Sequence, residues 1–576
     1  MFKLVRFLKG YMFKTVSGPF FKLVEAVFEL ITPLVVAYVI DTAIPEGAAG
    51  NYRPLITGAA IIVALGVVGL GFSLTAQFFA SRASLGFGTN LRRDLYAHVL
   101  SLSPAEFDKI SAPSLITRLT ADVNQAQQAV AMFIRLVTRA PFIVIGATVM
   151  SIIIDLKLSL IFIGAAIVIG LVLFIILTTT MPKYKRVQEK LDKTMLLTRE
   201  QLAGARVVRA FNAESREEKT FAGAADDLSR SSIRVGAISA LLNPLTYALI
   251  NVAVILLLQF GGKQVYYGNL TQGQIIALVN YLMQILNALV VFANLLVIFT
   301  KASASAARIN EVFAIKPGMS EGNGATPDEN APAFTYDNVS FTYPSAQKPS
   351  VENVNLTVLK GESIGILGGT GSGKTTVVSL LPRLYDITQG TVTAFGHDVR
   401  EYTFAQLRSL VSLAEQKSVL FAGSIRDNML VGKPDATDAE ILTALERAQA
   451  LDFVLDHGGL EAYVEAGGKN LSGGQRQRLN VARALVSMPK ILILDDSSSA
   501  LDFATDARLR HALKVLREET GMTTVTVSQR ATTLSGCDQI MVLDEGEVVG
   551  LGKHDDLMAS CEVYREIVRS QDREGK

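Results

Sequence analysis

The sequence predicts a helical membrane domain followed by a soluble α/β domain, and three observations support this prediction. Apolar residues make up 49% of the 576-residue chain and gather in long segments before residue 300. After residue 333, β-rich runs alternate with helical runs, as in α/β domains. Between the two lies a linker rich in Gly, Pro, Asn and acidic residues. We therefore expect a transmembrane domain at 1–310, a linker at 311–332 and a soluble domain at 333–576.

Six segments are long enough to cross a bilayer as helices, which takes about 20 residues. The clearest are VIGATVMSIII and LIFIGAAIVIGLVLFIIL, whereas Lys22, Glu25 and Glu29 interrupt the first segment. Because the number of segments is even, both chain ends should lie on the same side of the membrane. The expected spans are 17–42, 54–80, 131–154, 158–181, 239–263 and 274–299.

The connections between the spans predict the orientation. Those at 81–130 and 182–238 are long, rich in Lys and Arg and helical in pattern, whereas the other three are short and carry few basic residues. Positive residues stay inside, so the long connections, the N-terminus and the soluble domain should be cytoplasmic in a multi-pass protein of the inner (plasma) membrane. The basic, amphipathic start MFKLVRFLKGYMFK predicts a helix on the cytoplasmic membrane face.

Composition argues against two classes of function. The net charge is only +2, so we expect no broad surface for nucleic acid. No residue cluster has metal-ligand spacing, and the two cysteines, Cys537 and Cys561, are expected to be free packing residues.

The stretch GILGGTGSGKTT follows a strand-like run and opens a helical one, which is the context of a P-loop. The glycines let backbone N–H groups turn toward phosphate oxygens, and the helix N-terminus adds positive potential. Lys374 would reach the β- and γ-phosphates of a nucleotide, and the Thr375 hydroxyl a Mg²⁺ ion. The loop residues are Gly368, Gly369, Thr370, Gly371, Ser372, Gly373, Lys374, Thr375 and Thr376.

Three further stretches bear on the same nucleotide. ILILDD places Asp495 at the end of a second buried strand, where it would hold Mg²⁺ through water. Tyr343, in VSFTYP, is either an adenine-stacking aromatic or a core residue. LSGGQ at 471–475 precedes a helix and makes a second anion-binding N-terminus. A chain with its own P-loop needs this second phosphate site only if it serves the nucleotide of another molecule.

With these motifs in this order, the sequence resembles a half-transporter of the ATP-binding cassette (ABC) exporter superfamily over essentially its whole length. The resemblance implies six spans with long cytoplasmic extensions, then an α/β P-loop NTPase cassette with a helical subdomain, using ATP and Mg²⁺. It also implies that two cassettes enclose two ATP molecules, each between the P-loop of one and the LSGGQ of the other. That arrangement accounts for the second phosphate site.

The family's pattern assigns roles to single residues. Tyr343 matches the adenine-stacking position, and Gln416 matches the glutamine that senses Mg²⁺ beside Thr375 and Asp495. Asp502, at the end of SALD, matches the loop that crosses the dimer interface. The signature residues that would contact the partner's ATP are Leu471, Ser472, Gly473, Gly474 and Gln475.

Three positions depart from that pattern. Asp496 stands where the family has the general-base glutamate, Gln529 where it has the switch histidine, and Ala466 where it has an acid before the signature. An aspartate draws the carboxylate back by roughly 1 Å, and a displacement of that size costs on the order of 10²-fold in rate. A glutamine can donate to a γ-phosphate but cannot carry a proton. We therefore expect a site that binds ATP and hydrolyses it slowly; the alternative is harmless drift.

The intact signature predicts a partner. A homodimer would pair two impaired sites, whereas a second, homologous half-transporter with an intact glutamate and histidine would form one active site with this LSGGQ. The sequence thus resembles the degenerate-site subunit of heterodimeric bacterial multidrug ABC exporters.

Two further sets of residues bear on coupling and cargo. SPAEFDK at 103–109 and FNAESREEKT at 211–220 match the family's coupling helices, or are solvated turns. Paired charges toward the cytoplasmic ends of the first and third spans would form a polar wall for amphipathic or cationic cargo. The alternatives are an ordinary solvated helix end or an internal ion pair. An exporter of drugs or lipid-like compounds is the leading prediction, with a lipid or peptide translocase or an ATP-gated channel-like protein as alternatives. The candidate cargo residues are Glu25, Glu29, Arg135 and Arg139.

Overall fold

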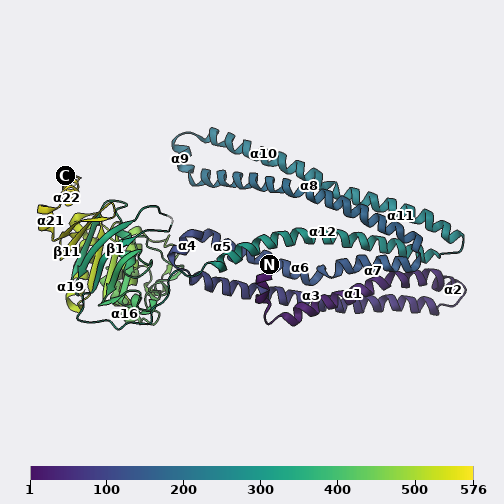
Figure 1. Ribbon diagram of the computed structural model, residues 1–576, viewed down its shortest axis with the longest axis horizontal. Coiled ribbons are helices and arrows are strands. Elements are labelled where there is room, and N and C mark those ends of the chain that lie inside the picture. The colour runs from purple at the N-terminus through teal and green to yellow at the C-terminus, as the bar shows by residue number, and fades with distance from the viewer. Residues whose placement is uncertain (1, 345, 575–576) are drawn as a thin grey trace. The chain divides into compact units, whose positions relative to one another are not determined.

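The computed structural model describes residues 2–344 and 346–574, and the chain forms two compact units (Figure 1). Unit 1 comprises residues 1–100 and 113–314, and unit 2 comprises residues 101–112 and 315–576. Unit 1 is built of helices, and unit 2 contains all the strands of the described part of the chain.

Within the described residues, unit 1 has six helical runs that are long and apolar enough to cross a membrane, which confirms the expected number of spans. Three runs are unbroken helices, α3 (Arg53–Leu100), α8 (Leu156–Ala203) and α12 (Gln272–Ala314). The other runs contain α1 (Met12–Tyr38), α2 (Ile44–Ala48), α5 (Ala112–Thr117), α6 (Val123–Met132), α7 (Arg139–Ile154), α10 (Glu214–Ala240) and α11 (Leu242–Tyr266). The short helix α9 (Ala205–Ala210) lies between α8 and α10.

The helices continue well beyond the length of a bilayer span. At 1.5 Å per residue α8 is about 70 Å long, against about 30 Å of hydrocarbon. α8 packs beside α10, and together they form the long hairpin of Figure 1. The prediction that the long connections are helical continuations of the spans is therefore confirmed. One contact between such continuations is the ion pair of Arg308 on α12 with Asp122 in the π-helical turn Arg118–Asp122.

The N-terminal segment packs partly against the rest of unit 1. Residues Phe2–Leu8 form a 3₁₀ helix, and Leu4 and Phe7 are buried. The Phe7 ring stacks on Phe313 of α12 at 5.7 Å, and Asn90 of α3 donates a hydrogen bond to the Phe7 carbonyl. Leu4 and Phe7 thus pack against protein, whereas Val5, Met12 and Phe13 of the same basic segment are exposed, and its placement on a membrane stays a prediction.

Unit 2 contains two main sheets. The larger has the order β12-β11-β3-β10-β9-β6, with parallel pairing from β11 to β6, and the smaller is antiparallel with the order β2-β1-β4-β5. The strands are β1 (Phe334–Phe341), β2 (Val351–Val358), β3 (Ser363–Gly368), β4 (Gln389–Ala394), β5 (His397–Asp398), β6 (Val411–Ala414), β7 (Gly423–Ser424), β8 (Tyr463–Val464), β9 (Ile491–Asp495), β10 (Thr523–Ser528), β11 (Gln539–Asp544) and β12 (Glu547–Gly552).

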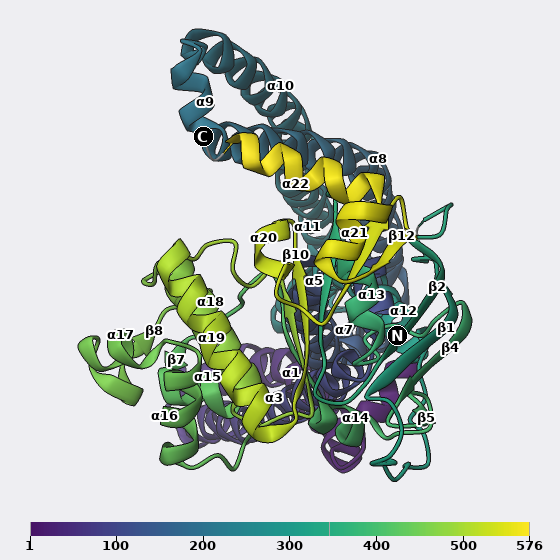
Figure 2. The ribbon, with the colours of Figure 1, turned by 90° about the vertical axis from the view of Figure 1, so that its left-hand side faces the viewer.

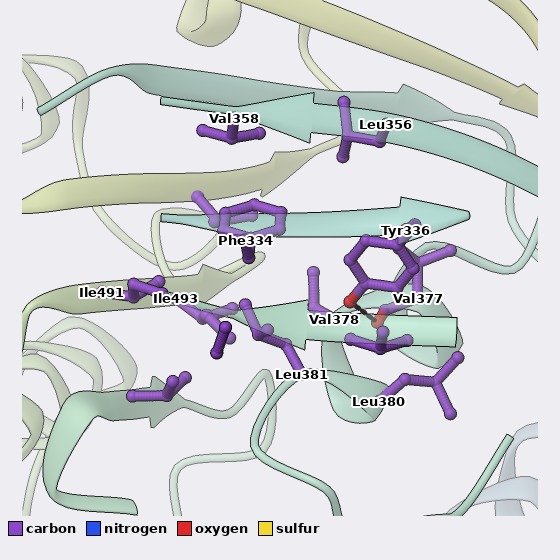
Figure 3. Packing of buried hydrophobic residues seen from close by; sticks show 14 of the residues in the cluster. Phe334, Tyr336, Leu356, Val358, Val377, Val378, Leu380, Leu381, Ile491 and Ile493 are labelled. Carbon is purple, nitrogen blue, oxygen red and sulfur yellow. Dashed lines mark hydrogen bonds between the residues drawn. The ribbon is translucent and has the colours of Figure 1, made fainter. Parts of the chain in front are cut away.

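The main core of unit 2 lies around α13 (Lys374–Leu380), the helix that follows β3 (Figure 3). Val377 and Val378 of this helix share one buried cluster with Phe334 of β1 and Ile493 of β9. The Tyr336 hydroxyl donates to the Val377 carbonyl at 2.8 Å, so the buried polar atoms are paired. Each large apolar side chain buried here contributes about 1.5–3 kcal/mol, and the cluster thereby anchors the helix that carries the P-loop lysine.

A second cluster forms the expected helical subdomain, in which α18 packs on α15 and α16 (Figure 2). Its helices are amphipathic, with residues such as Leu445 and Leu479 fully buried. The fold class predicted from the sequence is thus confirmed. The helices of unit 2 are α4 (Pro104–Ile110), α13, α14 (Phe404–Leu410), α15 (Ile425–Leu430), α16 (Asp438–Arg447), α17 (Leu451–Asp456), α18 (Gly473–Leu485), α19 (Phe503–Thr520), α20 (Ala531–Leu534), α21 (His554–Ser560) and α22 (Glu562–Glu574).

Candidate functional site

The candidate site forms where four parallel strands end. In the sheet Leu367 of β3 pairs with Ser528 of β10, and Val527 pairs with Asp495 of β9. The carboxyl ends of β3, β10, β9 and β6 therefore meet at one edge, which is where ligands bind in open α/β sheets. The P-loop, Asp495, Gln529 and Gln416 follow these four strands directly, so the topology brings them to the same edge.

The P-loop has the backbone that its glycines permit. Gly371 and Gly373 have φ of 84° and 94°, a region open to glycine at little cost. A Cβ at Gly373 would lie 2.6 Å from the Ser350 carbonyl oxygen, which is closer than any side chain can approach. Gly369, Thr370 and Gly371 are exposed, and Ser372 and Thr376 are buried. The exposed loop ahead of a helix N-terminus is suited to phosphate.

The side chain of Lys374 is buried within the P-loop. Its Nζ donates to the carbonyls of Gly368 at 2.9 Å and Gly369 at 2.6 Å. Burial lowers the pKa of Lys374, while the charges of Asp495 and Asp496 act in the opposite direction. The ammonium group is thus held among carbonyl and carboxylate oxygens, in an orientation fitted to phosphate oxygens.

The donor set also fits Mg²⁺. Burial raises the pKa of the buried Asp495 carboxyl above its ordinary value, and the nearby Thr375 hydroxyl acts in the opposite direction. Hydroxyl and carboxylate oxygens are the ligands that Mg²⁺ prefers, with waters and substrate phosphates completing its coordination. Consistently, the described residues contain no cluster of three or more His, Cys, Asp or Glu that would hold a metal alone. Thr375, Asp495 and Gln416 would hold the ion, which supplies neutralising charge to the phosphates.

Asp496 lies directly after this pair, with φ of 44°. Aspartate tolerates this left-handed region better than most residues. Gln416 donates through Nε2 to one Asp496 carboxylate oxygen at 3.2 Å, and the Asp496 backbone N–H donates to Val527 at 3.1 Å. Burial raises the pKa of Asp496. The structure therefore brings together the two residues predicted to sense Mg²⁺ and to replace the glutamate.

Tyr343 lies beside the first turn of α13. Its hydroxyl and that of Thr376 are 3.2 Å apart, and its half-buried ring contacts Phe341 and Tyr385 edge-on at 4.8 and 5.3 Å. The ring thus packs partly against the core and is adjacent to the P-loop, so both interpretations of this tyrosine stay open.

The signature stands on a different helix from the P-loop. Ser472 caps α18, its backbone N–H donating to the Gln475 side chain at 2.8 Å, and it is exposed, whereas Leu471 is buried. The glycines Gly473 and Gly474 are half-exposed in the first turn. The Asp502 carboxylate accepts the Thr505 N–H at 2.8 Å and so caps α19.

Sequence reasoning missed a residue that ties these parts together. The buried Gln477 donates to the Ser499 hydroxyl at 3.0 Å and accepts from the Ala500 N–H at 3.0 Å. It therefore fixes the loop between Asp496 and Asp502. A second glutamine two residues after LSGGQ was the only signal for it.

Gln529 follows β10 and is exposed. Its backbone carbonyl accepts a hydrogen bond at 2.7 Å from Nε2 of Gln571 on α22. No sequence pattern pointed to Gln571. Ala466, the third departure, is exposed after β8.

The two predicted coupling segments belong to different units. Residues 103–109 form most of α4, with a capping box between Ser103 and Glu106, and they group with unit 2. The Tyr385 hydroxyl donates to the Asp108 carboxylate at 3.1 Å. Residues 211–220 form a turn and the start of α10 in unit 1, where Phe211 is 79% exposed.

The candidate cargo residues are paired within unit 1. Glu29 and Arg139 form an ion pair at 2.5 Å, Lys22 and Glu25 another at 2.5 Å, and Arg135 donates to a serine hydroxyl of α3. The internal ion pair anticipated from the sequence is therefore present. A cavity of about 60 Å³ adjoins it, lined by Glu29, Leu136, Arg139, Ala140, Ile143, Gln284, Asn287, Ala288 and Val291.

Known families match both halves of this architecture. Residues 16–289 match the ABC transporter transmembrane region, and residues 351–499 match the ABC transporter family. An uncharacterised ABC transporter ATP-binding protein of Mycobacterium tuberculosis is 36% identical, over 96% of this chain and 94% of that protein. A multidrug efflux ATP-binding/permease protein of the same organism is 31% identical over 95% of this chain and 45% of its own length.

A solved structure matches as well. A bacterial Atm1-family ABC exporter with ATP bound has a TM-score of 0.79 and 23% identity, covering 97% of this chain and 98% of that one. The fold and the site thus define an ATP-binding cassette transporter, and the chain belongs to this family. Within this chain the transmembrane region comes first and the nucleotide-binding cassette second, and its fold is that of the ATP-bound exporter structure.

Proposed function

We propose that this chain is the degenerate-site subunit of a heterodimeric ABC exporter that moves drugs or other amphipathic compounds out of the cytoplasm or inner leaflet. One observation carries the proposal: the residues that would bind ATP are complete, while Asp496 and Gln529 occupy the two positions that would drive hydrolysis. The partner is a homologous half-transporter with an intact glutamate and histidine at those positions.

The proposed roles of this chain's residues follow from their geometry. Lys374 and the P-loop N–H groups bind the phosphates, and Thr375 and Asp495 orient Mg²⁺. The Asp496 carboxylate is held by Gln416 and is shorter than a glutamate, so it orients water poorly. ATP therefore stays bound longer here, while Ser472 and the signature glycines complete the partner's site.

The proposed orientation places the N-terminus and the cassette in the cytoplasm of a cell whose inner (plasma) membrane holds the six spans. The basic residues of the long connections support it. The multidrug efflux relative supports drug-like cargo. Lipid or peptide translocation by the same architecture is the alternative.

The deciding experiment is native mass spectrometry of the tagged chain, extracted gently from its own membrane. The expected result is a one-to-one assembly with a second, different chain of similar size. A dimer of this chain alone would refute the heterodimer, because Asp496 and Gln529 would then have to support all hydrolysis.

A further inference from the structure

The side chain of Gln571 bridges two backbone groups of the loop that contains Gln529. Its Nε2 donates to the Gln529 carbonyl at 2.7 Å, and its Oε1 accepts from the Ala531 N–H at 2.9 Å. These groups lie between the last residue of β10 and the first of α20, where no strand or helix partner satisfies them. The side-chain amide of Gln571 thus satisfies the backbone groups of the residues on both sides of Arg530, as a neighbouring strand would in a sheet.

The helix that carries Gln571 is anchored to the P-loop strand. Cys561 and Tyr564 of the α21–α22 region are buried in one cluster with Leu367, Ala531 and Leu534. Leu367 immediately precedes the first P-loop glycine. Figure 2 shows α22 beside α21, and α22 also packs on α20. Gln571 therefore binds the loop at 529–531 from a helix, α22, that packs against the strand leading into the P-loop.

The same loop is held from a second direction. The Arg530 guanidinium lies 5.5 Å from the centre of the Phe503 ring, and the Arg530 N–H donates to the Ser528 hydroxyl at 3.0 Å. Phe503 follows Asp502 and begins α19. With its backbone fixed on both sides, Gln529 keeps an exposed side chain at the edge where β3, β10 and β9 end.

We propose that Gln571 is a positioning residue, which holds the Gln529 backbone so that the Gln529 amide contacts the γ-phosphate of ATP. The inference rests on the proposed role of Gln529. A neutral amide offers a weaker contact than a charged donor, so its placement matters more. Discrimination between ATP and ADP at this chain's site then depends on the C-terminal helix.

The test uses the assembled transporter with Gln571→Met, which keeps the length of the side chain and removes both hydrogen bonds. Affinities of ATP and ADP for this chain's site are measured by competition with a photoreactive ATP analogue, reading the label on this chain. Hydrogen exchange of residues 528–534 is measured in parallel. We expect faster exchange and an ATP affinity lower by about tenfold, with ADP affinity unchanged.

Two further variants sharpen the test. Gln571→Glu keeps the acceptor for the Ala531 N–H and loses the donor to Gln529, so its ATP affinity should be intermediate. Ser570→Ala is the matched control, because the exposed Ser570 hydroxyl donates to the Ile567 carbonyl of its own helix. It should leave both affinities and the exchange unchanged.

Two outcomes would overturn the inference: unchanged exchange in Gln571→Met, or an unchanged ATP-to-ADP preference. Equal losses for both nucleotides belong to the second outcome and would indicate a purely structural role. Gln529→Ala separates this failure from that of the proposed function. If Gln529→Ala loses ATP preference and Gln571→Met does not, only the positioning role is wrong. If Gln529→Ala itself keeps the preference, the role of Gln529 is wrong.

Discussion

The two phosphate-binding sequences of unit 2 differ in how their polar groups are satisfied. The P-loop closes on itself, since the buried Lys374 donates to the carbonyls of Gly368 and Gly369. The signature is open: Ser472 is exposed, and the glycines that follow it are half-exposed. The P-loop has its bonding partners within this chain, whereas the signature leaves a helix N-terminus exposed, which we propose contacts the ATP of the partner chain.

This difference indicates which of the two sequences is expected to contribute more to ATP turnover. The P-loop is held by internal bonds of Ser372 and Lys374, although Gly369, Thr370 and Gly371 are exposed. Asp496, which replaces the family's glutamate, belongs to the closed half, that is, the P-loop and the strand ends beside it. The open half, the signature at 471–475, has its full LSGGQ motif. Changes in the open half should therefore harm turnover most, and changes at Asp496 least.

The largest effect is expected from Gly473→Asp. In the proposed heterodimer, a carboxylate at the start of α18 would repel the γ-phosphate of the partner's ATP, so we expect the ATPase rate of the assembled transporter to fall at least about 10²-fold. ATP labelling of this chain's own P-loop should persist. The rate is measured by phosphate release and the labelling with a photoreactive ATP analogue.

Gly536→Asp is the matched control, because a Cβ there meets nothing within 4 Å. It should leave the rate within about twofold of the unmodified protein, as is usual for surface changes. Normal turnover in Gly473→Asp would mean that the open half contacts no ATP.

The second largest effect is expected from Lys374→Ala. Hydrogen bonds to charged groups contribute about 1.5–3 kcal/mol, so ATP affinity at this chain's site should fall about 10–100-fold. The measurement is nucleotide labelling resolved by chain. Lys360→Ala is the control, since Lys360 precedes β3 at the opposite edge of the sheet and pairs with Glu329. Equal loss in both variants would contradict a specific role for Lys374.

The sequence predicted most of the fold because its signals were local and long. The six apolar runs and the strand–loop–helix around Lys374 each carry their pattern within one segment. Parallel pairing then brings Asp495, Gln416 and Gln529 to one edge, as their positions after strands imply. The periodicity that placed the N-terminal helix on a membrane could not show that Phe7 would stack on Phe313.

The remaining parts of the site could not be predicted, because they depend on contacts distant in sequence. Gln477 bonds residues 22 and 23 positions away, and Gln571 bonds residues 40 and 42 positions away. A lone glutamine on a helix gives no local signal of such a partner. The pairing of Glu29 with Arg139 across 110 positions is of the same kind.

A smaller effect is expected from Tyr385→Phe, which removes the hydrogen bond to Asp108 of α4 and keeps the ring packing. Burial raises the pKa of Tyr385, so the hydroxyl is protonated and donates at any physiological pH. One hydrogen bond contributes about 1 kcal/mol, so dye-stimulated ATPase should fall about fivefold, with basal ATPase unchanged. The measurement compares both rates in proteoliposomes with a fluorescent amphipathic dye.

A double-mutant cycle with Asp108→Ala isolates that contact, because alanine has no side-chain acceptor for the Tyr385 hydroxyl. If the hydrogen bond couples cargo to turnover, the double variant should lose no more than either single variant. Additive losses would show that the two side chains act separately. The hydrogen bond between Tyr385 and Asp108 of α4 would then not couple cargo to turnover.

The smallest effect is expected from Asp496→Ala. Because the glutamate of the partner drives most turnover in the proposed heterodimer, total ATPase should change by less than about threefold, whereas the corresponding change in the partner should cost about 10²–10⁴-fold. The comparison is made by phosphate release from assemblies that carry one variant at a time. Gln416 donates to Asp496, so nucleotide labelling of this chain checks that ATP binding survives. Equal and severe losses from both variants would mean that the two sites are alike, and that the shorter carboxylate of Asp496 is an adequate base.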